Sequence, residues 1–237
     1  MFVTQAIVLA GGLGTRLGDR SKHTPKPMQM VGSKPFLEYV IFNLKVHGVT
    51  DIVLAVGYLS DVIRDHFGDG QLFGVRIRYV VEEKPAGTAG ALLNCASLLE
   101  DWFYLINGDT IFDADLNDLA KLCRGSDKIG ALALRTVSNV FQYGEVEVQC
   151  SIVTKFAEKK NSCPGLVSGG IAVLSNRVVA YLSSSPCSME RDVFPALVSA
   201  RQLLGREYSG FFLDIGLPET LSLAQSVVVD WRKRKLV

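Results

Sequence analysis

Residues 4–18 read TQAIVLAGGLGTRLG, and this stretch decides how the rest of the chain is interpreted. Thr4 to Ala10 is an apolar run of strand length that leads into a glycine-rich loop. Glycine lets backbone N–H groups come close to a phosphate, and Arg16 supplies a forked cation in the same loop. The stretch therefore predicts a buried strand followed by an anion-binding loop. A tight strand-to-helix turn with a surface arginine is the alternative.

Two known phosphate-binding loops do not match this stretch. A dinucleotide fingerprint has the form G-x-G-x-x-G, but after Gly12 and Gly14 the next glycine is Gly18. No acidic residue that would bind a ribose stands at the expected distance, and the P-loop pattern G-x-x-x-x-G-K-[ST] is absent. A nicotinamide-dependent dehydrogenase is therefore disfavoured.

Strand-like and helix-like segments alternate through the first half of the chain, which implies a mostly parallel sheet with helices on both faces. The predicted strands are 4–10, 51–56, 75–81 and 103–106, and the predicted helices are one capped by Ser33 and ended by Gly48, then 60–67 and 88–99. Strands with short connections follow, as expected for antiparallel hairpins, at 129–136, 144–149 and 152–156. The remaining predictions are strands at 170–174 and 207–213 and helices at 176–182, 190–200 and 218–229.

These segments predict an α/β fold of Rossmann-like type, with a mixed, mostly parallel central sheet and a smaller antiparallel lobe. No linker is visible, so residues 1–237 are expected to form a single domain with parts of about 1–113 and 114–237. Net charge is +1, from 25 Lys and Arg against 24 Asp and Glu, which argues against nucleic acid as a partner. The basic tail Trp231 to Lys235 is expected to be a solvated end.

Targeting and redox signals are weak. No apolar segment approaches the ~20 residues of a membrane span, so we expect a cytoplasmic protein with no membrane partner. The five cysteines are scattered and odd in number, which favours buried reduced thiols over a disulfide framework.

A second motif, Pro25-Lys26-Pro27-Met28, places a lysine on a backbone with little freedom, so little entropy is lost when its ammonium binds an anion. Together with Leu9 to Leu17, it resembles the signature of the sugar-1-phosphate nucleotidyltransferases. The resemblance covers nearly the whole chain in order, through Gly87-Thr88-Ala89-Gly90, Asn107-Gly108-Asp109, Tyr143-Gly144, Glu158-Lys159 and Asp214-Ile215-Gly216.

The resemblance implies that a sugar 1-phosphate attacks the α-phosphorus of a nucleoside triphosphate and releases pyrophosphate. It makes Arg16, Lys26 and Asp109 the catalytic residues, and Asp109 and Asp214 the ligands of Mg²⁺, the implied cofactor. The part up to residue 113 would bind the nucleotide through Leu9, Ala10, Gly11, Gly12, Gly14, Thr15, Arg16, Lys26, Glu82, Pro85, Gly87, Thr88 and Gly108. Nothing in the sequence itself shows that the two aspartates meet.

The part from residue 114 would bind the sugar phosphate through Gly144, Glu158, Lys159, Ser168, Gly169 and Glu190. Here the chain departs from the family. Glu158-Lys159 is followed by lysine where proline is usual, and Ser168 replaces an asparagine before Gly169. A helix-start acid explains Glu190 equally well.

Glu82 bears on the choice of base. A carboxylate offers only acceptors, and the Watson–Crick edge of guanine presents two adjacent donors, so Glu82 favours GTP. A solvated acid at a strand end is the alternative, which would leave a thymidylyl- or uridylyltransferase open. The short chain resembles the guanylyl subgroup that acts on a heptose 1-phosphate; mannose 1-phosphate is the alternative, and a homo-oligomer is possible. A non-catalytic relative that binds nucleotide sugars is disfavoured because Arg16, Lys26, Asp109 and Asp214 are all present.

Overall fold

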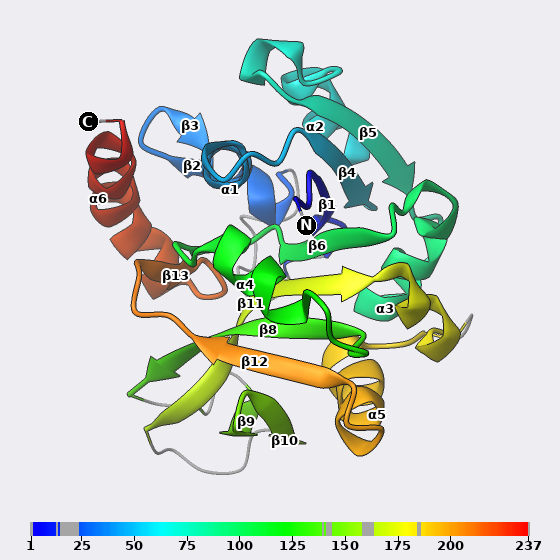
Figure 1. Cartoon of the computed structure of the whole chain (residues 1–237). Coiled ribbons are helices and arrows are strands. Elements are labelled where there is room, and N and C mark those ends of the chain that lie inside the picture. The colour runs from blue at the N-terminus through cyan, green and yellow to red at the C-terminus, as the bar shows by residue number, and fades with distance from the viewer. Residues whose placement is uncertain are drawn as a thin grey trace.

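The computed structural model describes residues 2–12, 14, 24–138, 140, 144–157, 164–183 and 186–236. Within these ranges a nine-stranded sheet runs through the molecule in the order β5-β4-β1-β6-β11-β8-β12-β10-β9 (Figure 1). Its strands are β1 (Gln5–Leu9), β4 (Asp51–Val56), β5 (Arg76–Val81), β6 (Trp102–Asn107), β8 (Gly130–Val137), β9 (Glu145–Gln149), β10 (Ile152–Ala157), β11 (Gly165–Ser175) and β12 (Leu203–Glu207).

The direction of the strands changes along this sheet. Strands β5, β4, β1 and β6 are parallel to one another, as are β8 and β12. Strand β11 lies antiparallel between β6 and β8, and β9 and β10 form an antiparallel hairpin. The predicted parallel sheet with an antiparallel extension is therefore confirmed. Strands from both predicted parts of the chain, before and after residue 113, belong to this one sheet.

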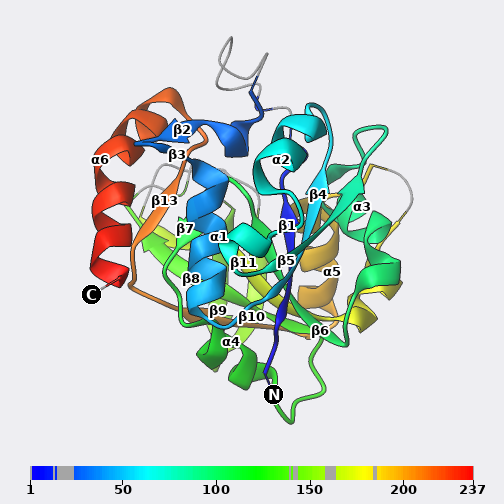
Figure 2. The same cartoon turned by 90° about the horizontal axis from the view of Figure 1, so that it is seen from above.

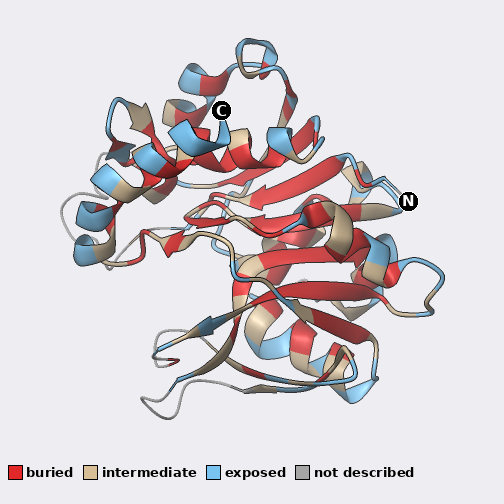
Figure 3. Cartoon of the chain, turned by 60° about the vertical axis from the view of Figure 1, so that its left-hand side comes forward, coloured by how far each residue is buried: buried red, intermediate tan, exposed pale blue. Residues whose placement is uncertain are grey.

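Helices cover both faces of the sheet, as predicted (Figure 2). Side chains of β1 alternate between the two cores: Ala6 and Val8 pack on one face and Ile7 on the other. One core includes α1 (Phe36–Val46), α2 (Ser60–Phe67), α4 (Leu116–Cys123) and α6 (Pro218–Lys235). The other includes α3 (Gly87–Asn94) and α5 (Phe194–Ser199). Figure 3 shows the central strands almost entirely buried between these layers.

Short elements complete the described chain. Two small antiparallel pairs are formed by β2 (Met30–Val31) with β3 (Lys34–Pro35) and by β7 (Thr110–Phe112) with β13 (Phe212–Asp214). Single turns of 3₁₀ helix cover Lys26–Met28, Gln71–Phe73 and Ala96–Leu98, a longer one covers Asn176–Tyr181, and a π-helical turn covers Met189–Val193.

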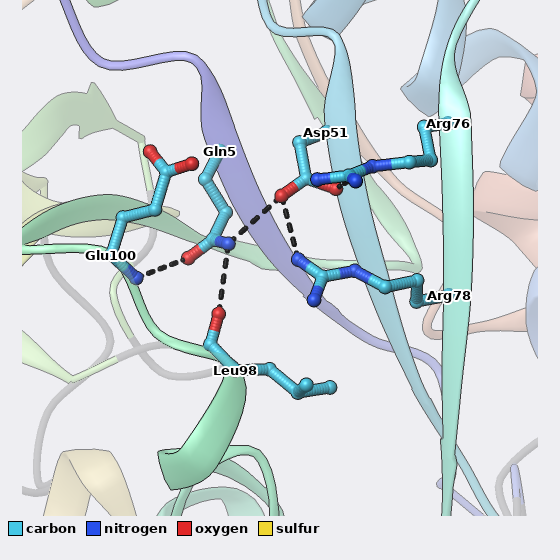
Figure 4. A network of polar contacts seen from close by, with 6 residues as sticks. All are labelled: Gln5, Asp51, Arg76, Arg78, Leu98 and Glu100. Carbon is cyan, nitrogen blue, oxygen red and sulfur yellow. Dashed lines mark hydrogen bonds and ion pairs between the residues drawn. The ribbon is translucent and has the colours of Figure 1, made fainter.

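The amino ends of the parallel strands are held by a network of polar side chains (Figure 4). Gln5 is fully buried; its amide donates to Asp51 at 3.0 Å and to the Leu98 carbonyl at 2.9 Å, and its oxygen accepts from the Glu100 N–H at 2.8 Å. Two arginines from β5 also donate to the Asp51 carboxylate, Arg76 at 3.1 Å and Arg78 at 2.7 Å. The network ties together β1, β4, β5 and the turn before β6.

Burial and hydrogen bonding shift the pKa of Asp51 in opposite directions. Desolvation alone would raise this pKa, but the bonds from Gln5 and Arg76, with the charge and bond of Arg78, together hold it below its ordinary value. The carboxylate is therefore a satisfied structural charge rather than a proton donor or acceptor.

Three predictions about elements are wrong. Ser33 is not the cap of α1, which begins after Pro35; Gly32 has φ +59° and turns the chain between β2 and β3 instead. The strand predicted at 207–213 is two strands, β12 and β13, with a bend at Gly210. A side chain at Gly210 would lie 1.8 Å from the Asp113 carbonyl oxygen, so the backbones are in direct contact there.

The third is the basic tail, which is part of a helix rather than a loose end, although Lys233, Arg234 and Lys235 are exposed as predicted. Helix α6 continues to Lys235, and Trp231 is 2% exposed and stacks on Phe211 with ring centres 5.7 Å apart. The Arg232 guanidinium lies 5.0 Å from the centre of the Phe42 ring, and Lys235 forms an ion pair with Asp113 at 2.8 Å. The Arg232 guanidinium thus docks the helix on α1, and Lys235 ties the end of the helix to Asp113.

The cysteine prediction is partly confirmed. The four cysteines that the structure describes are free, and Cys95, Cys123 and Cys187 are buried. Burial raises the pKa of Cys95 and of Cys123 to about 12, so neither thiol is reactive near neutral pH. Cys150, in the turn between β9 and β10, is exposed, which contradicts the prediction, and Cys163 lies outside the described residues. None of the described helices has the length and apolarity to cross a membrane.

Candidate active site

A cavity of about 680 Å³ opens at the carboxyl ends of β1, β4 and β6. Parallel strands all end on this side, so the loops that follow them converge there. Predicted nucleotide-binding residues from three separate segments line it, namely Leu9, Ala10, Gly11, Gly12, Gly14, Lys26, Glu82, Pro85, Gly87 and Thr88, and Asp109 lines it as well. The structure therefore brings most of the predicted nucleotide residues to one hollow. Thr15 and Arg16 lie outside the described residues.

Glycine is required where the first loop leaves β1. A side chain at Gly11 would lie 3.2 Å from the Gly57 nitrogen at the end of β4, so the two loops pass in close contact. Gly108 plays a similar part behind the cavity: its N–H donates to the Leu9 carbonyl at 3.0 Å, and a side chain there would lie 2.8 Å from that oxygen. Gly108 supports the cavity wall but does not itself line the cavity.

Lys26 forms an ion pair with Asp109 at the cavity. The short helical turn Lys26–Met28 positions the lysine, and Asp109 follows the end of β6. Side-chain exposure is 16% for Lys26 and 32% for Asp109, so both groups are partly desolvated yet accessible from the cavity. A cation with little freedom next to a carboxylate suits the binding of a phosphate and a metal ion together.

Asp214 reaches the same place from far along the chain. Strand β13 pairs with β7 so that Asp214 stands opposite Thr110, and the Ile215 N–H donates to the Asp109 carbonyl at 3.0 Å. A side chain at Gly216 would lie 2.6 Å from an Asp214 carboxylate oxygen and 3.6 Å from the Lys26 ammonium. The Asp214 carboxylate therefore lies near Lys26 and its partner Asp109, which the sequence alone did not show, although Asp214 does not itself line the cavity.

Glu82 directly follows β5, and its N–H donates to the Val56 carbonyl at 2.8 Å. Its side chain is half-buried and lines the cavity, on a different segment of the chain from Lys26. A carboxylate placed there could meet a base while the phosphates lie near the glycine loop.

The predicted sugar-binding residues divide into three groups. Ser168 and Glu190 line a smaller hollow beside the main cavity, and Leu9 and Asn107 line both. Gly169 is buried where a side chain would lie 2.2 Å from the Phe112 ring, and Gly144 precedes β9; neither lines either hollow. Glu158 and Lys159 lie outside the described residues.

Several cavity residues were not predicted from the sequence. Asn107 ends β6 and lies between the two hollows, while Tyr58 and Glu83 line the main cavity. The position of Asn107 could have been found, because it stands directly before Gly108-Asp109 at a strand end. Tyr58 follows Gly57 in the loop after β4, and only the contact of Gly57 with Gly11 reveals where that loop lies.

A parallel α/β sheet with a glycine loop, a fixed lysine and two converging aspartates at its carboxyl end defines a class of protein that binds a nucleotide through its phosphates. The family model described as "Nucleotidyl transferase" matches residues 5–229. The chain belongs to this nucleotidyltransferase family and is an enzyme of that class.

Individual relatives agree with this assignment. The chain is 37% identical to a D-glycero-alpha-D-manno-heptose 1-phosphate guanylyltransferase of Campylobacter jejuni, over 91% of this chain and 96% of the relative. It is 32% identical to mannose-1-phosphate guanyltransferase beta-A of Xenopus laevis, over 91% of this chain but 62% of that longer protein. The structure of HddC from Yersinia pseudotuberculosis complexed with GMP-PN matches with a TM-score of 0.81 at 29% identity, covering 94% of this chain and 98% of HddC.

Proposed function

We propose that this enzyme transfers GMP from GTP to D-glycero-α-D-manno-heptose 1-phosphate and releases pyrophosphate. The observation that carries the transfer chemistry is the meeting of Lys26, Asp109 and Asp214 beside the glycine loop. The 37% identity to a guanylyltransferase of this heptose phosphate supports the substrate pair.

In the proposed reaction, an oxygen of the sugar phosphate attacks the α-phosphorus of GTP. A new P–O bond forms as the bond from the α-phosphorus to the bridging oxygen breaks, and pyrophosphate leaves with the bonding electrons. Such a displacement depends on positioning and on neutralising charge more than on proton transfer. The backbone of Gly11, Gly12 and Gly14 would hold the triphosphate, and the Lys26 ammonium would stabilise negative charge on the transferring phosphoryl group.

Mg²⁺ fits the residues present. It takes oxygen ligands and keeps several waters, so two carboxylates with phosphate oxygens are a sufficient set. Asp109 and Asp214 would hold it, and it would neutralise phosphate charge when bound. Arg16 would bind the leaving pyrophosphate, as the family resemblance implies.

Glu82 supports GTP over other nucleotides. A half-buried carboxylate on the cavity wall can accept from both N1–H and N2–H₂ of guanine, whereas uracil and thymine present one donor between two acceptors. Mannose 1-phosphate is the second candidate acceptor, favoured by 32% identity to a mannose-1-phosphate guanyltransferase.

The test is a matrix of the common nucleoside triphosphates against heptose and mannose 1-phosphates, scored by Mg²⁺-dependent pyrophosphate release. We expect the highest kcat/KM with GTP and the heptose 1-phosphate. A preference for UTP or dTTP would refute guanylyl transfer, and a preference for mannose 1-phosphate would refute the heptose assignment alone.

A further inference from the structure

The start of α3 and the segment before α5 are clamped together, although about a hundred residues separate them. The Ala89 N–H donates to the Cys187 carbonyl at 2.9 Å, and the Cys187 N–H donates to the Ala86 carbonyl at 2.8 Å. Gly87 has φ +77°, and a side chain on it would lie 2.4 Å from the Cys187 carbonyl oxygen. The backbones therefore touch, and this contact joins the nucleotide part of the chain to the sugar part.

Within this clamp the Thr88 hydroxyl has one defined orientation. It accepts from the Met189 N–H at 2.8 Å and donates to Oε2 of Glu190 at 3.0 Å. A hydroxyl has a single proton, so the bond from Met189 leaves that proton for the carboxylate. The Ser188 hydroxyl donates to the same oxygen at 3.0 Å. Both donors use Oε2, so Oε1 of Glu190 takes part in neither bond.

Within the described ranges, Glu190 is held by neutral groups alone. Among the ion pairs of the described ranges, none includes Glu190, whereas Glu38 pairs with Lys34 and Asp118 with Arg206. Two hydroxyl donors on one carboxylate oxygen orient the group but leave its negative charge uncompensated by a cation. Such a carboxylate remains a strong acceptor for further hydroxyl donors.

The pair spans the two hollows. Thr88 lines the main cavity, and Glu190 lines the smaller hollow together with Ser168 and Asn107. Because its single proton is donated to Glu190, the Thr88 hydroxyl cannot also donate to a nucleotide. The hydroxyl of a predicted nucleotide-binding residue is thus used to orient a predicted sugar-binding residue.

We propose that Thr88 is a positioning residue for the sugar 1-phosphate: by donating to Oε2 of Glu190, it holds the carboxylate so that Oε1 accepts a hydrogen bond from a sugar hydroxyl. This proposal rests on the proposed function, because it requires a sugar 1-phosphate beside the main cavity with one hydroxyl at the smaller hollow, which itself has room for only about 10 Å³. It assigns the specificity for the acceptor partly to a side chain of the nucleotide-binding part.

The test compares Thr88→Val, which keeps the shape but removes the hydroxyl, with Thr88→Ser, which keeps the hydroxyl. Thr50→Val is the matched control, because Thr50 is exposed at the opposite, amino end of β4. Each variant, together with Glu190→Gln and the double variant Thr88→Val with Glu190→Gln, is assayed for KM of both substrates. The assay uses whichever nucleotide and sugar 1-phosphate give the wild type its highest activity, so a wrong base or sugar contradicts the proposed function without affecting this comparison.

We expect Thr88→Val to raise KM for the sugar 1-phosphate about tenfold, the loss typical of one hydrogen bond to a charged group, and to leave KM for the nucleotide within about twofold. Thr88→Ser should restore the wild-type value. In the Glu190→Gln background, Thr88→Val should add less than about twofold, because it acts through the same carboxylate.

Three results would overturn the proposal: an unchanged KM for the sugar 1-phosphate in Thr88→Val, an equal rise for both substrates that Thr88→Ser does not rescue, or full additivity with Glu190→Gln. The second result would show that Thr88 only packs the clamp. Inactivity with every substrate pair would refute both this proposal and the proposed function.

Discussion

The two ends of the parallel strands carry polar groups that are used in opposite ways. At the amino ends, Gln5, Arg76 and Arg78 all donate to Asp51 in one network, in which the Nε of Arg78 has no partner among the described residues (Figure 4). At the carboxyl ends, glycine loops and charged groups line a cavity of about 680 Å³. The same strands therefore anchor the fold at one end and present chemistry at the other.

The difference lies in what surrounds each charge. The Asp51 side chain is 9% exposed and accepts from three donors, while that of Asp109 is 32% exposed and its ion-pair partner Lys26 also faces the cavity. Removing one partner from a buried network of charges lowers stability, whereas a charge that faces a cavity remains available to a ligand. Substitutions at the carboxyl ends should thus change activity, and substitutions at the amino ends should change stability.

Lys26→Ala should have the largest effect on activity. Loss of a preorganised donor to the transferring phosphoryl group costs about 2.7 to 4 kcal/mol, so kcat should fall at least about a hundredfold. The thermal midpoint should change little, because Asp109 is left partly exposed rather than buried and unpaired. Pyrophosphate release and thermal unfolding measure the two effects. Near-normal turnover would contradict the catalytic role, and loss of folding would contradict the contrast between the ends.

Asp214→Asn tests the proposed role of Asp214 as a ligand of Mg²⁺. We expect little activity at Mg²⁺ concentrations that saturate the wild type, with partial recovery at higher Mg²⁺, because one carboxylate ligand is weakened. Asn keeps an oxygen that can accept from the Gly216 N–H, which bonds to Asp214 at 2.8 Å, so the fold should persist. A Mg²⁺ titration of the rate decides; an unchanged Mg²⁺ requirement would remove Asp214 from the proposed site.

Glu82→Gln should change the base preference. A glutamine side chain offers one acceptor and one donor group, so it matches guanine less well than a carboxylate does. The ratio of kcat/KM for GTP over UTP should fall roughly tenfold to a hundredfold. Competition between the two nucleotides in one reaction measures this ratio directly. If the ratio is unchanged, Glu82 is a solvated strand-end acid, as the sequence allowed.

The sequence predicts the carboxyl-end chemistry better than it predicts the amino-end network. Glycines, Lys26 and Asp109 stand in short motifs whose residue types suit the binding of a phosphate or a metal ion. Gln5, Asp51 and Arg78 stand within strands, where nothing local distinguishes a buried polar side chain from an exposed one. Only the register of β1, β4 and β5 brings them together.

Long-range pairing also limited the prediction of the site. The meeting of Asp109 with Asp214 depends on the short β7–β13 pair, and three residues are too few for a periodic pattern. The tail was misread for a related reason. Arg232 and Lys235 read as solvated charges in the sequence. In the structure Trp231 anchors the last turns, the Arg232 guanidinium lies over a ring of α1, and Lys235 pairs with Asp113.

At the amino ends, Asp51→Asn should lower stability and leave kcat unchanged. Replacing a buried carboxylate that is bonded to two guanidinium groups should cost about 2 to 3 kcal/mol in the free energy of unfolding. The pKa of Asp51 is lowered in the folded state, so its contribution is complete above the unfolded pKa and is lost as the pH falls through about 4 and below. Denaturant unfolding at several pH values should show a smaller acid-induced loss in the variant. An equal loss in both proteins would mean that Asp51 is not linked to acid stability.

The smallest expected effect separates the two arginines of the network. The Arg76 side chain is 66% exposed and that of Arg78 is 32% exposed, although both donate to Asp51. Exposed ion pairs contribute little to stability, so Arg76→Ala should lower the free energy of unfolding less than Arg78→Ala does. Denaturant unfolding of the two variants under one condition gives the order. Because both arginines bind the same carboxylate, a reversed order would show that burial does not set the strength of these bonds, and the contrast between the two ends of the sheet would lose its physical basis.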